Sequence, residues 1–241
     1  MRAMILAAGR GERMRPLTDT CPKPLLAAGG KPLIVWQIEA LARAGLRDIV
    51  INHAWLGEKI EAALGDGTRF GVRLHYSAET EALETAGGIA QALPLLAEGT
   101  TGAGSVFLVV SGDIHCGYDY RRLLPLAARM ADAPEPRMHL VMVPNPAFHP
   151  DGDFALDDAG RLHGDGADKL TFGNIGLYDS RSFAHLAPGA RAAMGPLYRR
   201  AIAAGLATGE RYDGLWENIG TPAQLQALDQ RLRAGDLAGA P

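Results

Sequence analysis

Glycines and basic side chains gather near the N-terminus in a pattern that suits phosphate binding. The segment is Leu6-Ala-Ala-Gly9-Arg-Gly11-Glu-Arg13-Met-Arg15-Pro16-Leu17-Thr18, followed by Pro22-Lys23-Pro24-Leu25. Glycines let backbone N–H groups approach phosphate oxygens, and arginine and lysine supply positive charge. The G-x-x-x-x-G-K-[ST] motif is absent, and Met14 stands at the third glycine of the dinucleotide-binding fingerprint. We therefore predict a phosphate-binding loop of another kind; a glycine-rich turn with surface basic residues is the alternative.

The elements that must position this loop alternate between strand and helix. Short apolar runs predict strands, and apolar residues at helical spacing predict helices. The predicted strands are 3–7, 48–52, 72–76 and 105–110, and the predicted helices are 34–44, 57–64 and 86–96. This alternation predicts an α/β fold with a mainly parallel sheet and helices on both faces. Ligands of such folds bind at the carboxyl ends of strands, where the glycine loop, Asn52 and Asp113 lie.

The second half of the chain is less regular. Strands are predicted over 138–143 and 170–178, a hairpin over 153–163 with its turn at 157–160, and helices over 194–204 and 222–233. The segments 99–104 and after Gly235 are predicted as loop and tail. We find no linker or internal repeat, so we predict a single domain over residues 1–241.

Composition excludes several classes of protein. The 241 residues carry a net charge of −3, which argues against general nucleic-acid binding. No apolar run reaches the roughly 18 residues that span a bilayer. The apolar stretch 4–8 is followed at once by Gly9-Arg-Gly-Glu-Arg13, unlike a signal peptide. Two cysteines cannot build a disulfide scaffold. We expect a cytoplasmic protein without a nucleic-acid or membrane partner.

The N-terminal motif resembles the signature of the sugar-1-phosphate nucleotidyltransferases, also called nucleotide-sugar pyrophosphorylases. Other segments follow in the family's order: 51–56 (Ile-Asn-His-Ala-Trp-Leu), 83–88 (Leu-Glu-Thr-Ala-Gly-Gly), Gly112-Asp113 and 216–222 (Trp-Glu-Asn-Ile-Gly-Thr-Pro). The first two of these most resemble the short N-acetylmuramate α-1-phosphate uridylyltransferases of bacterial cell-wall recycling. The resemblance covers nearly the whole chain. It implies a Rossmann-like mixed sheet, with a nucleotide-binding portion at about 1–115 and a sugar-binding portion at about 116–241.

The reaction that the resemblance implies is nucleotidyl transfer, in which a sugar 1-phosphate attacks the α-phosphorus of a nucleoside triphosphate and pyrophosphate leaves. A phosphate monoester has a second pKa of about 6, so the nucleophile is already largely dianionic and needs little general base. Positioning and electrostatic stabilisation should then carry catalysis. The resemblance implies that Arg13 contacts the leaving phosphates and that Lys23 neutralises charge between the α-phosphate and the sugar phosphate. The residues implied to hold the triphosphate are Ala8, Gly9, Gly11, Glu12 and Arg13.

Asp113 is the predicted ligand of Mg²⁺. It follows an apolar strand, where a carboxylate is costly unless a cation or donors partner it, and Mg²⁺ takes one or two carboxylates beside waters and phosphates. The alternative is an N-cap for a helix from Tyr118 onward. Asn218 stands where the family usually has a second aspartate, and its amide oxygen can bind Mg²⁺ without adding charge. Glu217 points the other way if the segment is extended.

The resemblance also implies contacts to base and sugar. Gly87 and Gly88 fall in the base-reading loop, where glycine lets the backbone come close to uracil; a helix beginning at Glu84 and Thr85 is the alternative. Ser111 stands where these uridylyltransferases usually have asparagine, and a turn serine is the alternative. The implied sugar-binding residues are Asp153 and Asn174, with a turn aspartate and a backbone-satisfied strand asparagine as alternatives.

The function that these observations favour is Mg²⁺-dependent uridylyl transfer from UTP to N-acetylmuramate α-1-phosphate, within peptidoglycan recycling. The alternatives are glucose 1-phosphate with UTP or dTTP, mannose 1-phosphate with GTP, and a catalytically weak nucleotide-sugar-binding regulator, which Asn218 motivates. No hexapeptide repeat of the kind found in longer relatives is present. The sequence leaves the oligomeric state open, and a monomer is compatible with it.

Overall fold

A single mixed sheet of nine strands forms the centre of the computed structural model, which describes residues 1–98 and 104–237. Its central part is parallel and runs in the order β6 (Val106–Ser111), β1 (Ala3–Leu6), β4 (Asp48–His53), β5 (Arg73–Ala78). The long strand β11 (Lys169–Asp179) pairs antiparallel with β6 and brings in the second half of the chain. The remaining strands are β8 (Met138–Val143), β9 (Phe154–Leu156), β10 (Leu162–His163) and β12 (Ala207–Arg211).

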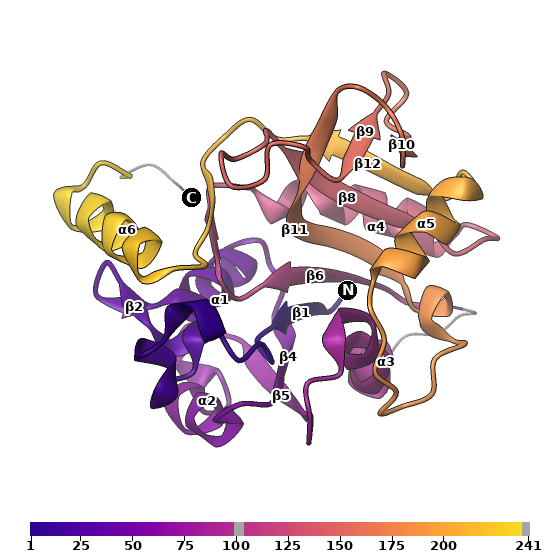
Figure 1. The fold of residues 1–241 in the computed structure, drawn as a ribbon. Helices are drawn as coiled ribbons and strands as arrows, with labels where there is room; N and C mark the ends of the chain where they lie inside the picture. Colours follow the sequence, from indigo (N-terminus) through magenta and orange to yellow (C-terminus); the bar gives the residue numbers. More distant parts are fainter. Residues whose placement is uncertain (99–103, 238–241) are drawn as a thin grey trace.

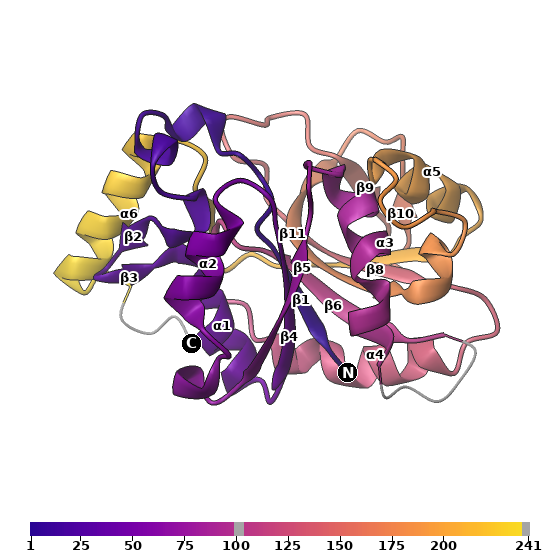
Figure 2. The same cartoon turned by 90° about the horizontal axis from the view of Figure 1, so that it is seen from below.

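Helices cover both faces of this sheet, which confirms the predicted fold class (Figures 1 and 2). Strand side chains alternate between the faces, so Ile5 packs in one core and Met4 in the other. The first face is covered by α1 (Leu33–Arg43), α2 (Gly57–Leu64) and α4 (Leu124–Ala131), and the second by α3 (Glu84–Ala97) and α5 (Gly195–Ala203). Every helix and strand predicted in the first half is present, with ends that differ from the prediction by at most two residues.

A third, smaller core joins the two ends of the chain. Leu225 and Leu228 of α6 (Pro222–Ala234) pack with Met14, Leu26 and Leu33. Figure 1 shows α6 beside β2 (Ala27–Ala28), the strand that pairs with β3 (Lys31–Pro32). The segment that precedes α6 is thereby brought back to the N-terminal glycine loop.

Several short elements were not predicted. The most consequential is the antiparallel pair β7 (Ile114–Cys116) and β13 (Trp216–Asn218). Helix α4 and strand β12 were also missed. The described residues also contain six 3-10 turns: η1 (Glu12–Met14), η2 (Leu17–Asp19), η3 (Lys23–Leu25), η4 (Thr68–Phe70), η5 (Tyr120–Leu123) and η6 (Ser180–Phe183). Most of the loop predicted over 99–104 and the end of the predicted tail, 238–241, lie outside the described residues.

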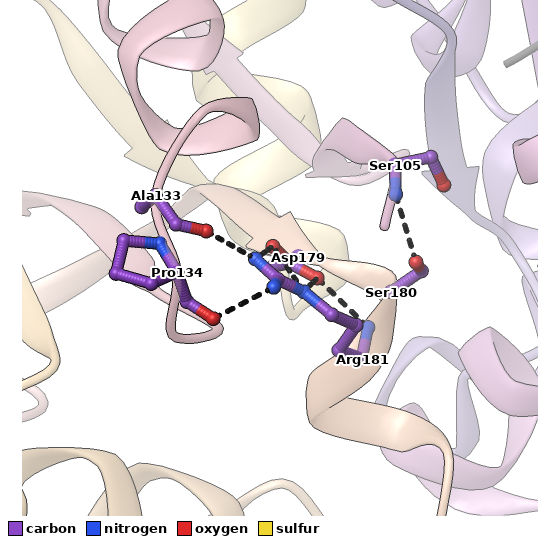
Figure 3. Close-up of polar contacts among 6 residues, drawn as sticks. All are labelled: Ser105, Ala133, Pro134, Asp179, Ser180 and Arg181. Atoms are coloured by element: carbon purple, nitrogen blue, oxygen red, sulfur yellow. Dashed lines mark hydrogen bonds and ion pairs between the residues drawn. The ribbon is translucent and has the colours of Figure 1, made fainter. Parts of the chain in front are cut away.

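A polar cluster around the ion pair of Asp179 and Arg181 joins the end of β11 to the amino end of β6 and to the segment after α4 (Figure 3). The Asp179 carboxylate is fully buried and lies 2.6 Å from Nη2 of Arg181. Arg181 also donates to the carbonyl oxygens of Ala133 (2.9 Å) and Pro134 (3.0 Å), just after α4. Ser180 Oγ accepts the N–H of Ser105 at 3.0 Å. This cluster fixes the end of the sheet opposite to the carboxyl end of β6.

Within the described part of the chain, no helix is both long enough and apolar enough to cross a bilayer.

Candidate active site

A cavity of about 250 Å³ opens at the carboxyl ends of β1, β4 and β6, where the topology predicted a ligand site. Five of the predicted site residues line it: Ala8, Gly9, Lys23, Ser111 and Asp113. Asn52, Glu79, Glu84 and Thr85 line it as well. The structure thus gathers backbone amides, one lysine and several acidic groups at one edge of the sheet.

Lys23 and Asp113 form an ion pair at this cavity. Lys23 Nζ lies 2.5 Å from Asp113 Oδ2, and the side chains are 12% and 28% exposed. Lys23 opens the turn η3, and Asp113 lies in the turn between β6 and β7. The cation that a carboxylate after a buried strand requires is therefore this lysine. The alternative role of Asp113 as an N-cap is wrong, because Asp119 caps η5 through the N–H of Arg121.

The rest of the glycine loop folds away from the cavity wall. Gly11 has a φ of +68°, and a Cβ there would lie 3.0 Å from Thr18 Cγ2 and 3.1 Å from Lys23 Cβ, so this tight turn requires glycine. Arg13 is exposed, and its Nη2 would lie 3.1 Å from a Cβ at Gly220. Arg13 therefore lies next to the segment that leads into α6. Gly11, Glu12 and Arg13 are not among the residues that line the cavity, and their triphosphate contacts stay predictions.

A buried hydrogen-bond network joins Asn52 and Glu79 in the wall of the cavity. Asn52 Oδ1 accepts the N–H of Ala7 at 3.0 Å, and its Nδ2 donates to Glu79 Oε1 at 2.7 Å. Glu79 Oε2 accepts the N–H of Leu83 at 2.9 Å. The network fixes the start of the glycine loop relative to the start of α3. The sequence predicted the place of Asn52 at this edge of the sheet, but it did not predict these contacts.

Gly87 and Gly88 make room for atoms of the protein itself. A Cβ at Gly87 would lie 2.3 Å from the carbonyl oxygen of Ala190, and one at Gly88 would lie 2.5 Å from Glu79 Oε1. The N–H of Gly87 donates to the carbonyl of Ala192 at 3.0 Å. The segment around residues 190–192 therefore packs on α3. Neither glycine is among the cavity-lining residues, and their contact with uracil stays a prediction.

Helix α3 begins in an unusual backbone conformation. Glu84, its first residue, has a φ of +60°, a region that residues other than glycine rarely adopt. Its carboxylate pairs with Arg191 Nε at 2.9 Å. Leu83 precedes the helix without a side-chain cap and Thr85 is its second residue, so the alternative prediction of a helix beginning at Glu84 and Thr85 is confirmed.

A second cavity, of about 400 Å³, is lined by both predicted sugar-binding residues, Asp153 and Asn174. Asn218, a predicted metal ligand, lines it as well. The other lining residues are mainly aromatic: Phe148, His149, Phe154, Phe172, Tyr198 and Trp216, with Thr171 and Gly195. Asn174 adopts a φ of +57° where the β11–β8 register is interrupted, so it does not continue the regular strand. The sequence analysis missed His149 and the aromatic residues of this wall.

The antiparallel pair β7–β13 connects the two cavities. Asn218 lies opposite Ile114, and the N–H of Ile219 donates to the carbonyl of Asp113 at 2.9 Å. Asn218 Oδ1 is buried and has no hydrogen-bond partner among the described residues. Glu217 points away and pairs with Arg231 of α6, as expected for the residue next to Asn218 on a strand.

Asp113 and Asn218 fit a cation that takes few protein ligands. A buried amide oxygen that accepts no hydrogen bond is energetically costly unless it binds a ligand. Asn218 has such an oxygen, and its strand, β13, pairs with β7, which directly follows Asp113. Within residues 1–98 and 104–237, no group of three or more His, Cys, Asp or Glu side chains could hold a metal. A Zn²⁺ site is therefore not supported in that part of the chain, whereas the donor set of Asp113 and Asn218 suits Mg²⁺, which keeps waters and substrate phosphates.

The other face of β7 carries His115, which lies opposite Glu217 of β13. His115 is buried, and burial lowers its pKa below the usual value of 6.5, so the ring is uncharged at neutral pH. It packs edge-on against Trp36 with 5.2 Å between ring centroids. This packing supports the strand that directly follows Asp113.

Comparison with known proteins identifies the family. The family described as nucleotidyl transferase matches residues 2–146. The N-acetylmuramate alpha-1-phosphate uridylyltransferase of Neisseria meningitidis serogroup B is 47% identical over 229 residues, covering 94% of this chain and 96% of that protein. A mannose-1-phosphate guanyltransferase of Gibberella zeae is 41% identical over 125 residues, covering 52% of this chain and 33% of that protein.

The fold also matches a solved structure. A crystal structure from Bacillus anthracis, provisionally described as a glucose-1-phosphate thymidylyltransferase, superposes with a TM-score of 0.81 at 22% identity, over 97% of this chain and 95% of that one. At this identity the match shows the fold alone. The resemblance seen in the motifs is confirmed, and the chain belongs to the nucleotidyl transferase family.

Proposed function

We propose that this chain transfers a uridylyl group from UTP to N-acetylmuramate α-1-phosphate, giving UDP-N-acetylmuramate and pyrophosphate. The 47% identity to the Neisseria meningitidis uridylyltransferase carries the proposal, because it extends over 94% of this chain and 96% of that protein. The mannose-1-phosphate guanyltransferase shares similarity over only 52% of this chain. We also propose that the reaction takes place in the cytoplasm.

The first cavity is the proposed site of the triphosphate. The backbone at Ala8 and Gly9 lines it and can donate N–H groups to phosphate oxygens. Lys23 lines the same cavity, paired with Asp113, and supplies the positive charge that two approaching phosphates require. Ser111 lines the same cavity and is a further nucleotide contact. Arg13, Gly11 and Glu12 stay candidates for the leaving phosphates.

The nucleophile needs no general base from the protein. The sugar phosphate is already largely dianionic at neutral pH, since its second pKa is about 6. The protein must instead bring two anions together in line, and Lys23 offsets their repulsion. Asp113 holds the Lys23 ammonium in place at 2.5 Å, so the charge is oriented before substrate binds.

Asp113 and Asn218 are the residues that would hold Mg²⁺. The bound ion would neutralise charge on the phosphates of the transferring group. Only one of the two ligands is charged, so we expect weaker binding of the free ion than at a site with two aspartates, and stronger dependence on the nucleotide's own phosphates.

The second cavity is the proposed sugar site. Asn174 and Asn218 offer amide groups that can bond hydroxyls, and the aromatic wall offers apolar surface for the faces of the ring and for acyl groups. Asp153 holds this wall together through the backbone N–H of Phe172, at 2.8 Å.

A substrate grid tests the proposal. Pyrophosphate release is measured with purified protein and Mg²⁺, pairing UTP, dTTP, GTP, ATP and CTP with N-acetylmuramate, N-acetylglucosamine, glucose and mannose 1-phosphates. The proposal expects the highest kcat/KM for UTP with N-acetylmuramate 1-phosphate. A higher value for another pair would replace the substrate, and silence across the grid with nucleotide still bound in calorimetry would favour a regulatory protein.

A further inference from the structure

The second cavity contains a histidine that is held in place by a carboxylate. His149 Nε2 lies 3.1 Å from Asp153 Oδ1, while Asp153 Oδ2 accepts the N–H of Phe172 at 2.8 Å. Both oxygens of Asp153 are therefore engaged by the protein. Because a carboxylate only accepts hydrogen bonds, Nε2 of His149 carries the hydrogen.

The segment that presents His149 is fixed at both ends. Asn145 Nδ2 donates to the carbonyls of Pro150 and Lys169, each at 2.9 Å, and its Oδ1 accepts the hydroxyl of Thr171, also at 2.9 Å. Gly152 closes the loop with a φ of +62°, and a Cβ there would lie 2.8 Å from Asn145 Oδ1. The loop is thus anchored to β11, although its tip is exposed.

The tip combines a partly exposed imidazole with an exposed aromatic ring. Phe148 is 57% exposed, more than the other large apolar side chains exposed on the described part of the chain, Met1 at 43% and Leu17 at 42%. The His149 side chain is 39% exposed. Among the described residues that line this cavity, His149 is the one side chain that can become positively charged.

We propose that His149, held by Asp153, recognises the carboxylate of the lactyl ether on the sugar substrate and so selects the acidic sugar. This inference rests on the proposed function. N-acetylmuramate differs from N-acetylglucosamine only by that lactyl group, which consists of a carboxylate and a methyl-bearing carbon. A protonated imidazole donates from both nitrogens, so Nδ1 can bond the substrate carboxylate while Nε2 stays on Asp153. Phe148 covers the apolar part of the same group.

The test compares two sugars in one enzyme. kcat/KM is measured for N-acetylmuramate and N-acetylglucosamine 1-phosphates with UTP, in the wild type, His149→Ala and His149→Lys. A lost hydrogen bond to a charged group predicts that His149→Ala lowers kcat/KM for the acidic sugar by about 10- to 100-fold. The value for N-acetylglucosamine 1-phosphate should stay within about twofold, and His149→Lys should restore much of the preference because it keeps a cation there.

A matched control distinguishes the effect of a charge at position 149 from the effect of a nearby charge outside the cavity. Arg199 of α5 is exposed and lies 3.3 Å from the Cβ position of Gly195, yet it does not line the cavity. Arg199→Ala should leave the ratio of the two kcat/KM values unchanged. Circular dichroism and thermal unfolding check that each variant is folded.

Different results would contradict the proposed function and the role of His149. If the wild type does not turn over N-acetylmuramate 1-phosphate, the proposed function is wrong and this inference falls with it. If the wild type prefers the acidic sugar but His149→Ala keeps that preference, or Arg199→Ala removes it, the proposed function stands and His149 is not the recognition residue. Equal loss for both sugars in His149→Ala would also overturn the inference, because it would indicate a structural role only.

Discussion

Lys23 Nζ and Asp113 Oδ2 lie 2.5 Å apart although 90 residues separate them in the chain. The pair places one positive and one negative group at the mouth of the same cavity. Each group holds the other in position, so neither has to reorganise when a charged ligand arrives.

Replacing Lys23 by alanine should reduce turnover while the fold persists. Loss of one oriented electrostatic group of this kind lowers kcat by about 100- to 1000-fold. Steady-state kinetics with UTP and N-acetylmuramate 1-phosphate measures the effect, and thermal unfolding reports on the fold. Lys31→Ala is the matched control. Lys31 Nζ pairs with Glu39 Oε2 at 2.7 Å, and neither residue lines the cavity. A kcat near that of the wild type would remove Lys23 from the mechanism.

Changing Asn218 to aspartate should lower the Mg²⁺ concentration that gives half-maximal rate. The substitution keeps the shape of the side chain and adds the charge that hard cations prefer. A Mg²⁺ titration of turnover measures the shift. Asn174→Asp adds the same charge to the wall of the same cavity and should not produce it. An unchanged metal dependence in Asn218→Asp would show that this residue is not a ligand.

Asn52→Ala should destabilise the protein. The substitution leaves the N–H of Ala7 and one oxygen of Glu79 without their partners in a buried place. We expect the free energy of unfolding to fall by about 1–3 kcal/mol. Urea unfolding measures it, with Gln91→Ala as the control, since Gln91 donates one exposed hydrogen bond to Ala78. If both variants lose the same amount, the network does not stabilise the fold as inferred.

Arg181→Ala should be more damaging than the loss of a surface ion pair. It leaves the fully buried Asp179 carboxylate without its cation, at a cost of about 3–5 kcal/mol. Arg211→Ala breaks an exposed pair with Asp213 and should cost less than about 1 kcal/mol. Urea unfolding of both variants checks the difference. Equal effects would contradict the structural role assigned to the cluster in Figure 3.

Glu210 should contribute stability that is lost in acid. The imidazole of His139, whose Nε2 lies 3.8 Å from Glu210 Oε2, lowers the pKa of Glu210 below its usual value of 4.5, and the hydroxyl of Tyr118, 2.7 Å away, acts in the same direction. A carboxyl whose pKa is lower in the folded state stabilises above its unfolded pKa and loses that contribution as the pH falls through the folded value.

The corresponding variant is Glu210→Gln. The gap in unfolding free energy between wild type and variant should narrow as the pH falls from 7 to about 3.5. Urea unfolding at a series of pH values gives the gap. A gap that does not change with pH would show that Glu210 titrates alike in the folded and unfolded chain.

The sequence by itself determined the regular elements of the first half of the chain. Each of its main strands and helices has a local signal, such as the apolar run before Gly9 or the helical spacing from Ile34 to Ala44. Local periodicity survives in the fold because it decides which side chains can be buried. The glycine loop and Asp113 were found for the same reason, since they follow buried strands whose carboxyl ends must share one edge of the sheet.

Only the tertiary structure decided how the site is connected. Strands β7 and β13 have three residues each, too few to show a period, and they exist because segments about a hundred residues apart pair with each other. The ion pair of Lys23 with Asp113 and the place of His149 beside Asp153 depend on such packing. The close contact of Gly87 with the backbone of Ala190 also depends on such packing, because a side chain at position 87 would collide with that segment. Contacts between distant segments leave no local pattern in one chain, because any residue of suitable size and charge can make them.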